Sequence, residues 1–296
     1  MSVVAAPVQQ FVTSQRLRIS YWDWGNEAAP LLLFVHGGSD HARSWDRIAE
    51  GLRDDYHVAA IDMRGHGDSD WAPGSQYSLP DMALDVVHVI EHLGAPAFVV
   101  GHSMGASTSL LAAGMYPELF AGIVALEGTH SMTPQSLREV GMGPAWMREY
   151  MEQARDYEDS EPVVYPTREA VAERLQRQAP SRSPELIAHL AEWGTREVSG
   201  GYVWKHDLWQ RARTGMEVRY DELPAFWANI DCPVLLVNAS HGSPRAAQRP
   251  GAEALFKAAR TITIDPSSHA IQHDQPERTI HEIRSFLAGL SPASHS

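Results

Sequence analysis

Cysteine is almost absent from this chain. Cys232 is the only one among its 296 residues. One cysteine cannot form an internal disulfide and leaves no cysteine-rich cluster for a metal ion, so we expect neither kind of cross-link. A chain of this length can bury roughly 75% of the surface that its unfolded form exposes, and therefore does not need one.

Long apolar runs are missing as well. No stretch approaches the roughly 20 apolar residues that a membrane span requires. The N-terminal segment, MSVVAAPVQQF, lacks the basic start and the longer apolar run of a secretory signal. We therefore expect a cytoplasmic protein with no membrane partner.

Positive charge is also in short supply. The chain has 24 lysines and arginines against 37 aspartates and glutamates, a net charge of −13. Nucleic-acid binding depends on a basic surface that neutralises phosphates, so this composition argues against that class. With no run of like charge, the acidity indicates solubility. The expected partner is a small-molecule substrate, and both monomer and homodimer remain open.

What the sequence does contain is a regular alternation of apolar runs and amphipathic helical patterns. Before residue 130, strands are predicted at 31–35, 58–61, 97–100 and 122–126, and helices at 44–53, 82–93 and 103–115. After Cys232, strands are predicted at 233–237 and 261–264, and helices at 246–259 and 276–287. Strands that alternate with helices indicate βαβ units and a parallel sheet.

The stretch between these two parts has a different pattern. It is helical throughout and is interrupted by several prolines and a glycine. An all-helical insertion between two parts of one sheet is typical of a cap rather than of an independent domain. We therefore predict an α/β core at residues 1–129 and 230–296 and a helical cap, or lid, at residues 130–229.

The strongest local motif is Gly101-His102-Ser103-Met104-Gly105, a G-x-S-x-G sequence. It follows a predicted strand and opens a predicted helix, which is the context that a nucleophile elbow requires. A serine in such a strained turn exposes its Oγ, and the helix N-terminus favours developing negative charge. Ser103 is the candidate nucleophile. The alternative is a serine that only caps a helix within a glycine-rich turn.

Three further motifs resemble those of one family. Residues 62–69 match D-x-R-G-x-G-x-S, residues 36–38 (His-Gly-Gly) are similar to an oxyanion loop, and Ser268-His269 is similar to a catalytic-histidine loop. With these motifs the chain resembles the α/β-hydrolase family over residues 16–290. The resemblance implies an α/β fold, a mostly parallel twisted sheet flanked by helices, with the helical cap inserted before the last two strands.

The resemblance also implies an oxyanion hole. Its donors would be the backbone N–H groups of Met104 and Gly38, and one such donor accelerates acyl transfer by roughly 10²–10³. The alternative is that residues 36–39 form only a tight loop. Taken alone, the turn at residues 62–69 is structural, and we expect Asp62 and Arg64 to pair.

Among fifteen histidines, His269 is the candidate general base. It lies between the last predicted strand and the last predicted helix, at the sheet edge where strand ends surround the nucleophile. The family order of serine, acid and histidine also ends with the histidine. His273 is the nearest rival, but it leads into the final helix.

The acid departs from the usual pattern. Most family members carry it in the loop after the strand that follows the cap, here residues 238–244, which contain no carboxylate. Asp231 precedes that strand and would lie at the wrong edge, and Glu253 falls within a predicted helix.

Glu127 is the candidate acid instead. It ends the predicted strand beside the nucleophile's strand, and neighbouring strands lie about 4.8 Å apart. This placement resembles a subset of the family that includes many haloalkane dehalogenases and a zearalenone lactonase. The alternatives are that Glu127 caps the sheet edge or pairs with an arginine, or that Asp265 is the acid.

A serine nucleophile argues against dehalogenase and epoxide-hydrolase chemistry, for which relatives use an aspartate. It favours an acyl-enzyme route on an ester or lactone. C–C bond hydrolysis, cofactor-free perhydrolysis and hydroxynitrile lyase chemistry use the same triad, and a slow or non-catalytic ligand receptor of the same fold is a further alternative. We expect no cofactor and no metal.

The predicted cap is rich in aromatic residues and methionine. Any one of these is more often a packing residue, but so many should also reach the cleft above Ser103, because ligand pockets are mostly apolar. Lys205 is the only lysine of this segment. We therefore expect a bulky, uncharged substrate, with His130, Trp146 and Trp204 as candidate contacts.

Overall fold

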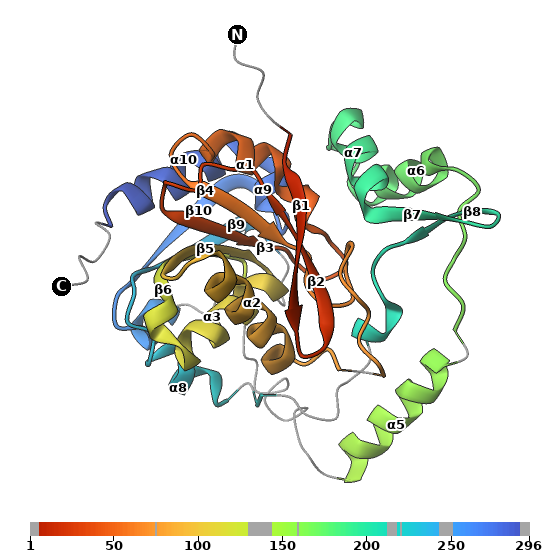
Figure 1. Cartoon of the computed structure of the whole chain (residues 1–296), viewed down its shortest axis with the longest axis horizontal. Coiled ribbons are helices and arrows are strands. Elements are labelled where there is room, and N and C mark those ends of the chain that lie inside the picture. The colour runs from red at the N-terminus through yellow and green to blue at the C-terminus, as the bar shows by residue number, and fades with distance from the viewer. Residues whose placement is uncertain are drawn as a thin grey trace.

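The computed structural model describes residues 6–74, 76–129, 144–158, 160–211, 218–219, 221–242 and 251–290. Its centre is an eight-stranded sheet in the order β1-β2-β4-β3-β5-β6-β9-β10 (Figure 1). Only the pairings of β1 with β2 and of β2 with β4 are antiparallel. The strands are β1 (Val8–Ser14), β2 (Leu17–Asp23), β3 (Leu31–Val35), β4 (His57–Ile61), β5 (Ala97–His102), β6 (Phe120–Leu126), β9 (Val234–His241) and β10 (Ala259–Ser268). The predicted fold class is confirmed.

The central strands are buried along their whole length and mostly apolar because helices cover both faces of the sheet. Every residue of β3, β4 and β5 is buried. Parallel strands in this position have continuous apolar runs instead of an alternating pattern, which is why the sequence identifies them so clearly.

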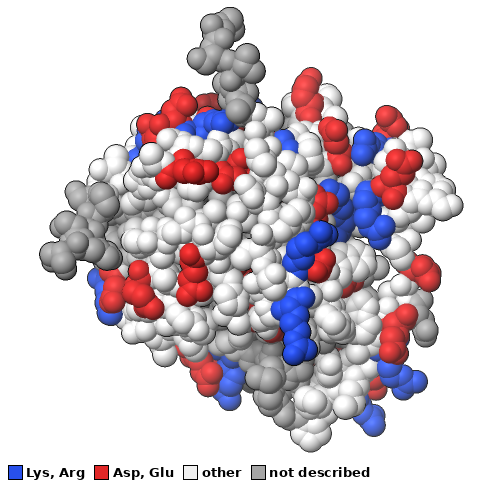
Figure 2. Space-filling model, viewed as in Figure 1, with Lys and Arg blue, Asp and Glu red and all other residues white. Residues whose placement is uncertain are grey.

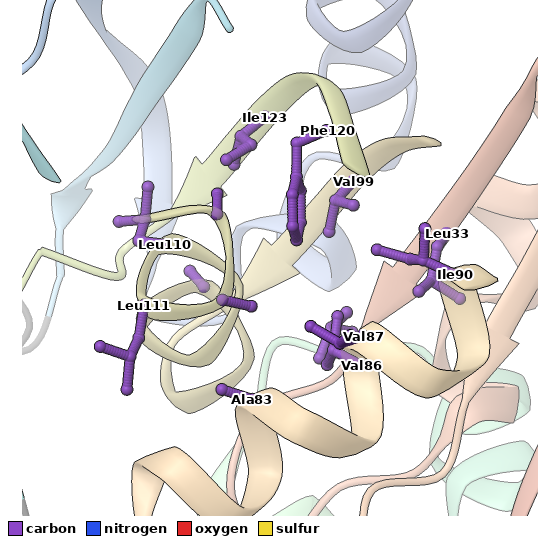
Figure 3. Packing of buried hydrophobic residues seen from close by; sticks show 14 of the residues in the cluster. Leu33, Ala83, Val86, Val87, Ile90, Val99, Leu110, Leu111, Phe120 and Ile123 are labelled. Carbon is purple, nitrogen blue, oxygen red and sulfur yellow. The ribbon is translucent and has the colours of Figure 1, made fainter. Parts of the chain in front are cut away.

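Two hydrophobic clusters lie on the two faces of the sheet. One packs the sheet against α2 (Leu79–Leu93), α3 (Met104–Met115) and α8 (Leu223–Trp227). Figure 3 shows part of it, with Val99 and Ile123 of the sheet facing Val86 and Leu110 of the helices. The other cluster packs the sheet against η1 (Ala42–Trp45), α1 (Asp46–Leu52), α9 (Ile271–Asp274) and α10 (Pro276–Ala288).

The N-terminal hairpin of β1 and β2 was not among the predicted strands. β1 (VQQFVTS) is an edge strand that is mostly exposed, so its sequence carries no continuous apolar signal. The predicted helix at 246–259 is also wrong where the structure describes it. Residues 252–255 form only a 3-10 turn, η4, and β10 begins at residue 259.

The insertion is not entirely helical, which corrects the predicted all-helical cap. It contains α5 (Pro144–Glu158), α6 (Arg168–Gln178), α7 (Pro184–Gly194) and η3 (Leu208–Arg211), and between α7 and η3 lie β7 (Thr195–Val198) and β8 (Gly201–Trp204). These two strands form a separate antiparallel hairpin. Gly200 and Gly201, with φ of 89° and 144°, allow the tight turn that connects them.

One part of the predicted cap packs with the core. α8 lies against α3, and its buried Leu223 and Trp227 belong to the same hydrophobic cluster as α2 and α3. No described helix is both long and apolar enough to cross a membrane. On the face shown in Figure 2, acidic and basic side chains are interspersed, and Lys205 forms an ion pair with Asp68 at 2.7 Å.

The turn at residues 62–69 is held differently from the expectation. Arg64 does not pair with Asp62 but forms two hydrogen bonds with buried Asp85, of 2.6 and 2.8 Å. Asp62 accepts the backbone N–H groups of Ala42 and Asp68, at 2.7 and 3.1 Å. The motif thus ties β4 to α2 and to the start of η1.

Candidate active site

Ser103 lies in a strained turn between β5 and α3. Its φ of 51° and ψ of −116° are outside the regions that most residues adopt. The flanking glycines make the turn possible. A Cβ at Gly101 would lie 2.6 Å from the Cα of Ala106, and one at Gly105 would lie 2.3 Å from the carbonyl oxygen of Val35. The elbow predicted from the motif is therefore present, with glycine required on both sides.

His269 lies beside this serine. Its Nε2 is 3.0 Å from Ser103 Oγ, a distance suited to proton transfer. The histidine follows β10, and the N–H of the preceding Ser268 donates to Asp274 at 2.7 Å. The two chain segments are 166 residues apart, and the carboxyl edge of the sheet brings them together.

His102 supports the backbone of His269, a role that the sequence did not suggest. Burial lowers the pKa of the His102 imidazole to about 3, so the ring is neutral. Its Nε2 lies 2.8 Å from the carbonyl oxygen of His269, which can only accept, so this nitrogen carries the proton. The Gln272 amide, 3.3 Å from Nδ1, supplies the matching donor. The sequence does not indicate this role of His102, because its partner Gln272 lies 170 residues away.

Glu127 reaches the other side of the same imidazole. Its Oε2 lies 3.3 Å from His269 Nδ1. Its Oε1 accepts the N–H of Ala239 at 2.8 Å, and the residue is only 1% exposed. Within the described ranges Glu127 contacts no arginine, so the arginine alternative has no support there. The carboxylate is held by β9 on one oxygen and is available to His269 on the other.

The two alternative positions for the acid are Asp265 and the segment after the strand that follows the cap, and neither places a carboxylate at His269 among the described residues. Asp265 is exposed in β10, and among the described residues no hydrogen bond joins it to His269. Residues 238–241 of the segment predicted to be the usual acid loop belong to β9, and Gly242 after them lies beside Glu127. A Cβ at Gly242 would lie 2.3 Å from Glu127 Oε2, so the chain approaches the carboxylate there with its bare backbone.

The candidate oxyanion loop runs past the elbow. Buried His36 lies with its Nδ1 2.7 Å from the carbonyl oxygen of Gly37, and its Nε2 accepts the N–H of Met63 at 3.0 Å. Burial holds the pKa of His36 well below its usual value, so this neutral arrangement persists. In a planar trans peptide N–H and C=O point in opposite directions. Holding the Gly37 carbonyl therefore turns the Gly38 N–H the other way.

Gly38 is close to the second candidate donor. A Cβ at Gly38 would lie 3.8 Å from Met104 Sδ, and one at Gly37 would lie 3.4 Å from the Cβ of Ser103. Met104 is the first residue of α3, where backbone N–H groups have no partner within the helix. The arrangement is compatible with the predicted oxyanion hole.

A cleft of about 580 Å³ opens beside this loop. It begins at Ser39 and passes between the core and the insertion; among the described residues its lining does not include Ser103. Its aromatic lining consists of Trp71, Tyr157, Tyr165, Trp204 and Trp209. The predicted contact Trp204 thus lies in the cleft wall. Trp146 belongs to α5 and is not part of this lining, and His130 lies outside the described residues.

Comparison with known proteins shows the family of this chain. The chain matches the alpha/beta hydrolase family over residues 32–282. It is 28% identical to a 2-(acetamidomethylene)succinate hydrolase of Mesorhizobium japonicum, over 88% of this chain and 88% of that protein. It is 27% identical to an esterase of Mycobacterium tuberculosis, over 96% of this chain and 91% of that protein.

The fold is also close to solved structures. The thioesterase domain from the curacin biosynthetic pathway has a TM-score of 0.82 at 22% identity, covering 95% of this chain and 100% of that chain. The structure of an E-2-(acetamidomethylene)succinate hydrolase has a TM-score of 0.78 at 24% identity, covering 95% and 99%. At these identities the likeness shows the fold alone.

Proposed function

Because this chain belongs to the α/β-hydrolase family and is a hydrolase, we propose that it cleaves a carboxylic ester or lactone through an acyl-enzyme on Ser103. The observation that carries the proposal is the continuous series Ser103–His269–Glu127. The contacts are 3.0 Å from Oγ to Nε2 and 3.3 Å from Nδ1 to Oε2. This is the arrangement of nucleophile, base and orienting acid that acyl transfer uses.

The reaction follows from these contacts. Ser103 Oγ attacks the carbonyl carbon while His269 Nε2 takes its proton. The N–H groups of Gly38 and Met104 stabilise the negative oxygen of the tetrahedral intermediate. His269 then returns the proton to the leaving alcohol, and the acyl group remains on Ser103. Water attacks in turn with His269 as base, and Ser103 leaves, releasing the acid.

Glu127 performs the role of the triad acid in this scheme. It accepts the Nδ1 proton of His269, which leaves Nε2 free to receive the proton of Ser103. The charge of Glu127 also stabilises the imidazolium that forms during the reaction. Since the Ala239 N–H fixes Oε1 at 2.8 Å, the carboxylate is positioned before the substrate arrives.

The aromatic cleft supports a bulky, largely uncharged substrate. Five aromatic residues line it and favour an apolar group beside the oxyanion loop. The lining also includes Arg174 and Arg211 together with Glu158 and Asp207, so its described part has equal numbers of positive and negative side chains. Lys205 is unsuited to bind a substrate anion because Asp68 already neutralises it, at 2.7 Å. The relative named as an esterase supports the ester assignment. Because the other relative is named for a succinate derivative, the ester of a dicarboxylate should be included in the substrate series for comparison.

The test is covalent labelling followed by a substrate series. A fluorophosphonate probe should label Ser103, and Ser103→Ala should abolish both labelling and turnover while leaving the fold intact. Ser199→Ala, in the exposed β7–β8 turn, is the matched control. Specificity constants should rise from acetyl to larger uncharged acyl groups. A steady fall along that series, or labelling that persists in Ser103→Ala, would refute the proposal.

A further inference from the structure

A side chain of the insertion covers the oxyanion loop. Gln210 belongs to η3, and its amide lies 2.9 Å from Ser39 Oγ at one end and 2.9 Å from His66 Nε2 at the other. A Cβ at Gly38 would lie 3.8 Å from the same amide. Gln210 therefore lies directly over the residue proposed to donate to the oxyanion.

His66 connects this amide to the backbone of the loop. The Ser39 N–H donates to His66 Nε2 at 3.1 Å. His66 Nδ1 lies 2.9 Å from the carbonyl oxygen of Arg64, which can only accept, so Nδ1 carries the proton. Burial lowers the pKa of His66, so Nε2 keeps its lone pair. A neutral imidazole thus fixes the peptide that follows Gly38, as His36 fixes the one that precedes it.

The tautomer of His66 also sets the orientation of the glutamine. The structure places Gln210 Nε2 2.9 Å from Ser39 Oγ and Gln210 Oε1 2.9 Å from His66 Nε2. Because His66 Nε2 carries no proton and accepts the Ser39 N–H, we assign the reverse orientation of the amide, in which its NH₂ group donates to His66. Its carbonyl oxygen then accepts the hydroxyl of Ser39. The two orientations of an amide have the same shape, and the hydrogen-bond network decides between them. Gln210 consequently donates a hydrogen bond to His66 and accepts one from Ser39.

The other side of η3 forms part of the aromatic cleft. Leu208, Trp209 and Arg211 line the cleft, while Gln210 between them turns to the loop. The start of η3 is anchored to the turn that carries His66, because the Asp207 N–H donates to the carbonyl oxygen of Gly65 at 2.7 Å. One short helix therefore contacts both the cleft and the oxyanion loop.

We propose that Gln210 is a positioning residue of the oxyanion hole, which holds Ser39 and His66 so that the Gly38 N–H faces the acyl oxygen. This role rests on the proposed acyl-transfer function. It links the loop to the wall of the substrate cleft. Because an oxyanion exists only in the transition state and the tetrahedral intermediate, loss of Gln210 should lower kcat and kcat/KM together.

The kinetic test compares two glutamines. Gln210→Ala should lower kcat about tenfold on both p-nitrophenyl acetate and a bulky aryl ester, with KM little changed, since losing an oxyanion donor itself costs roughly 10²–10³. Gln176→Ala is the matched control, because among the described residues the Gln176 amide donates to the carbonyls of Ala179, Pro180 and Arg182, away from the oxyanion loop. Gln210→Glu should remain impaired, since a carboxylate cannot donate to neutral His66.

A second readout follows the loop without any substrate. Amide hydrogen exchange at Ser39 should accelerate in Gln210→Ala and stay unchanged in Gln176→Ala. Normal kcat with normal exchange in Gln210→Ala, or a raised KM alone, would overturn the proposal. A wild-type protein that neither hydrolyses esters nor labels at Ser103 would refute the proposed function instead. The exchange comparison would then still decide whether Gln210 holds the loop.

Discussion

β6 and β9 are neighbouring parallel strands, but of the residues that follow them only the one after β6 contacts the ring of His269 in the described part of the chain. That residue is Glu127, whose N–H donates to the carbonyl oxygen of Val237 in β9 at 2.9 Å. Gly242 follows β9, and its lack of a side chain leaves room for the carboxylate. In most family members the acid follows the second of these strands. In this chain the residue after β6 can supply the carboxylate because the backbone after β9 leaves space for it.

The largest effect is expected from the acid itself. Glu127→Gln keeps the shape and the acceptor for the Ala239 N–H but removes the charge and favours the wrong tautomer of His269. By analogy with other triads, kcat should fall by roughly 10⁴. Steady-state kinetics on an activated ester measure it. Glu253→Gln, at an exposed carboxylate, is the control. A Glu127→Gln variant with near-normal kcat would show that the residue after β6 is not the triad acid.

The next largest effect should be a loss of folding stability at acidic pH, because several histidines of the core are buried, whereas His269 is partly exposed. Burial lowers the pKa of His36 well below its usual value and that of His41 and His102 to about 3. The unfolded chain, with pKa values near 6.5, therefore binds more protons below that pH. Each of these histidines then costs about 1.3 kcal/mol of stability as pH falls from about 7 to about 5.5. The buried carboxyls of Asp40 and Asp62, whose pKa burial raises to about 6, offset part of this loss.

Urea unfolding across this pH range checks the prediction. His41→Gln removes one of the three groups and should make the pH dependence shallower. A pH dependence in His41→Gln that equals that of the wild-type protein would show that His41 does not contribute to it.

The end of β9 offers a smaller but more specific test. Gly242→Ala places a methyl group where it would lie 2.3 Å from Glu127 Oε2, so the carboxylate must move away from His269. A displacement of about 1 Å at a catalytic group can cost roughly 10² in rate. Gly289→Ala is the control, because its Cβ would make only an ordinary contact, 3.5 Å from Phe286 O. Full activity with an unchanged melting temperature in Gly242→Ala would contradict this packing.

The smallest effect is expected at Asp265. This residue is exposed and makes no described contact with His269, so Asp265→Asn should change kcat by less than about threefold. The same ester assay compares it directly with Glu127→Gln. If Asp265→Asn shows the larger loss, the acid comes from β10.

The sequence predicts the centre of the molecule well because its signals are local. The apolar run LLLFV coincides with β3, residues 31–35, and the G-x-S-x-G motif coincides with the elbow at Ser103. Because β6 lies beside the nucleophile's strand β5, Glu127 lies at the predicted edge of the sheet, where it contacts His269. Its catalytic role stays a proposal.

What the sequence does not predict depends on distant partners. Arg64 bonds Asp85 and not Asp62, because α2 folds back over the turn. His102 and Gln210 contact residues 170 and 171 positions away in sequence, so no periodicity or spacing marks them. The β7–β8 hairpin was missed because four-residue strands are too short to show alternation within a helical stretch.

One measurement tests the bond between Glu127 and His269 most directly. In a complex with a boronic-acid transition-state analogue, the His269 Nδ1 proton should give a strongly downfield NMR resonance. The account predicts that Glu127→Gln abolishes this resonance and that Asp265→Asn retains it. A resonance that persists in Glu127→Gln and disappears in Asp265→Asn would contradict the assignment of the acid to the end of β6.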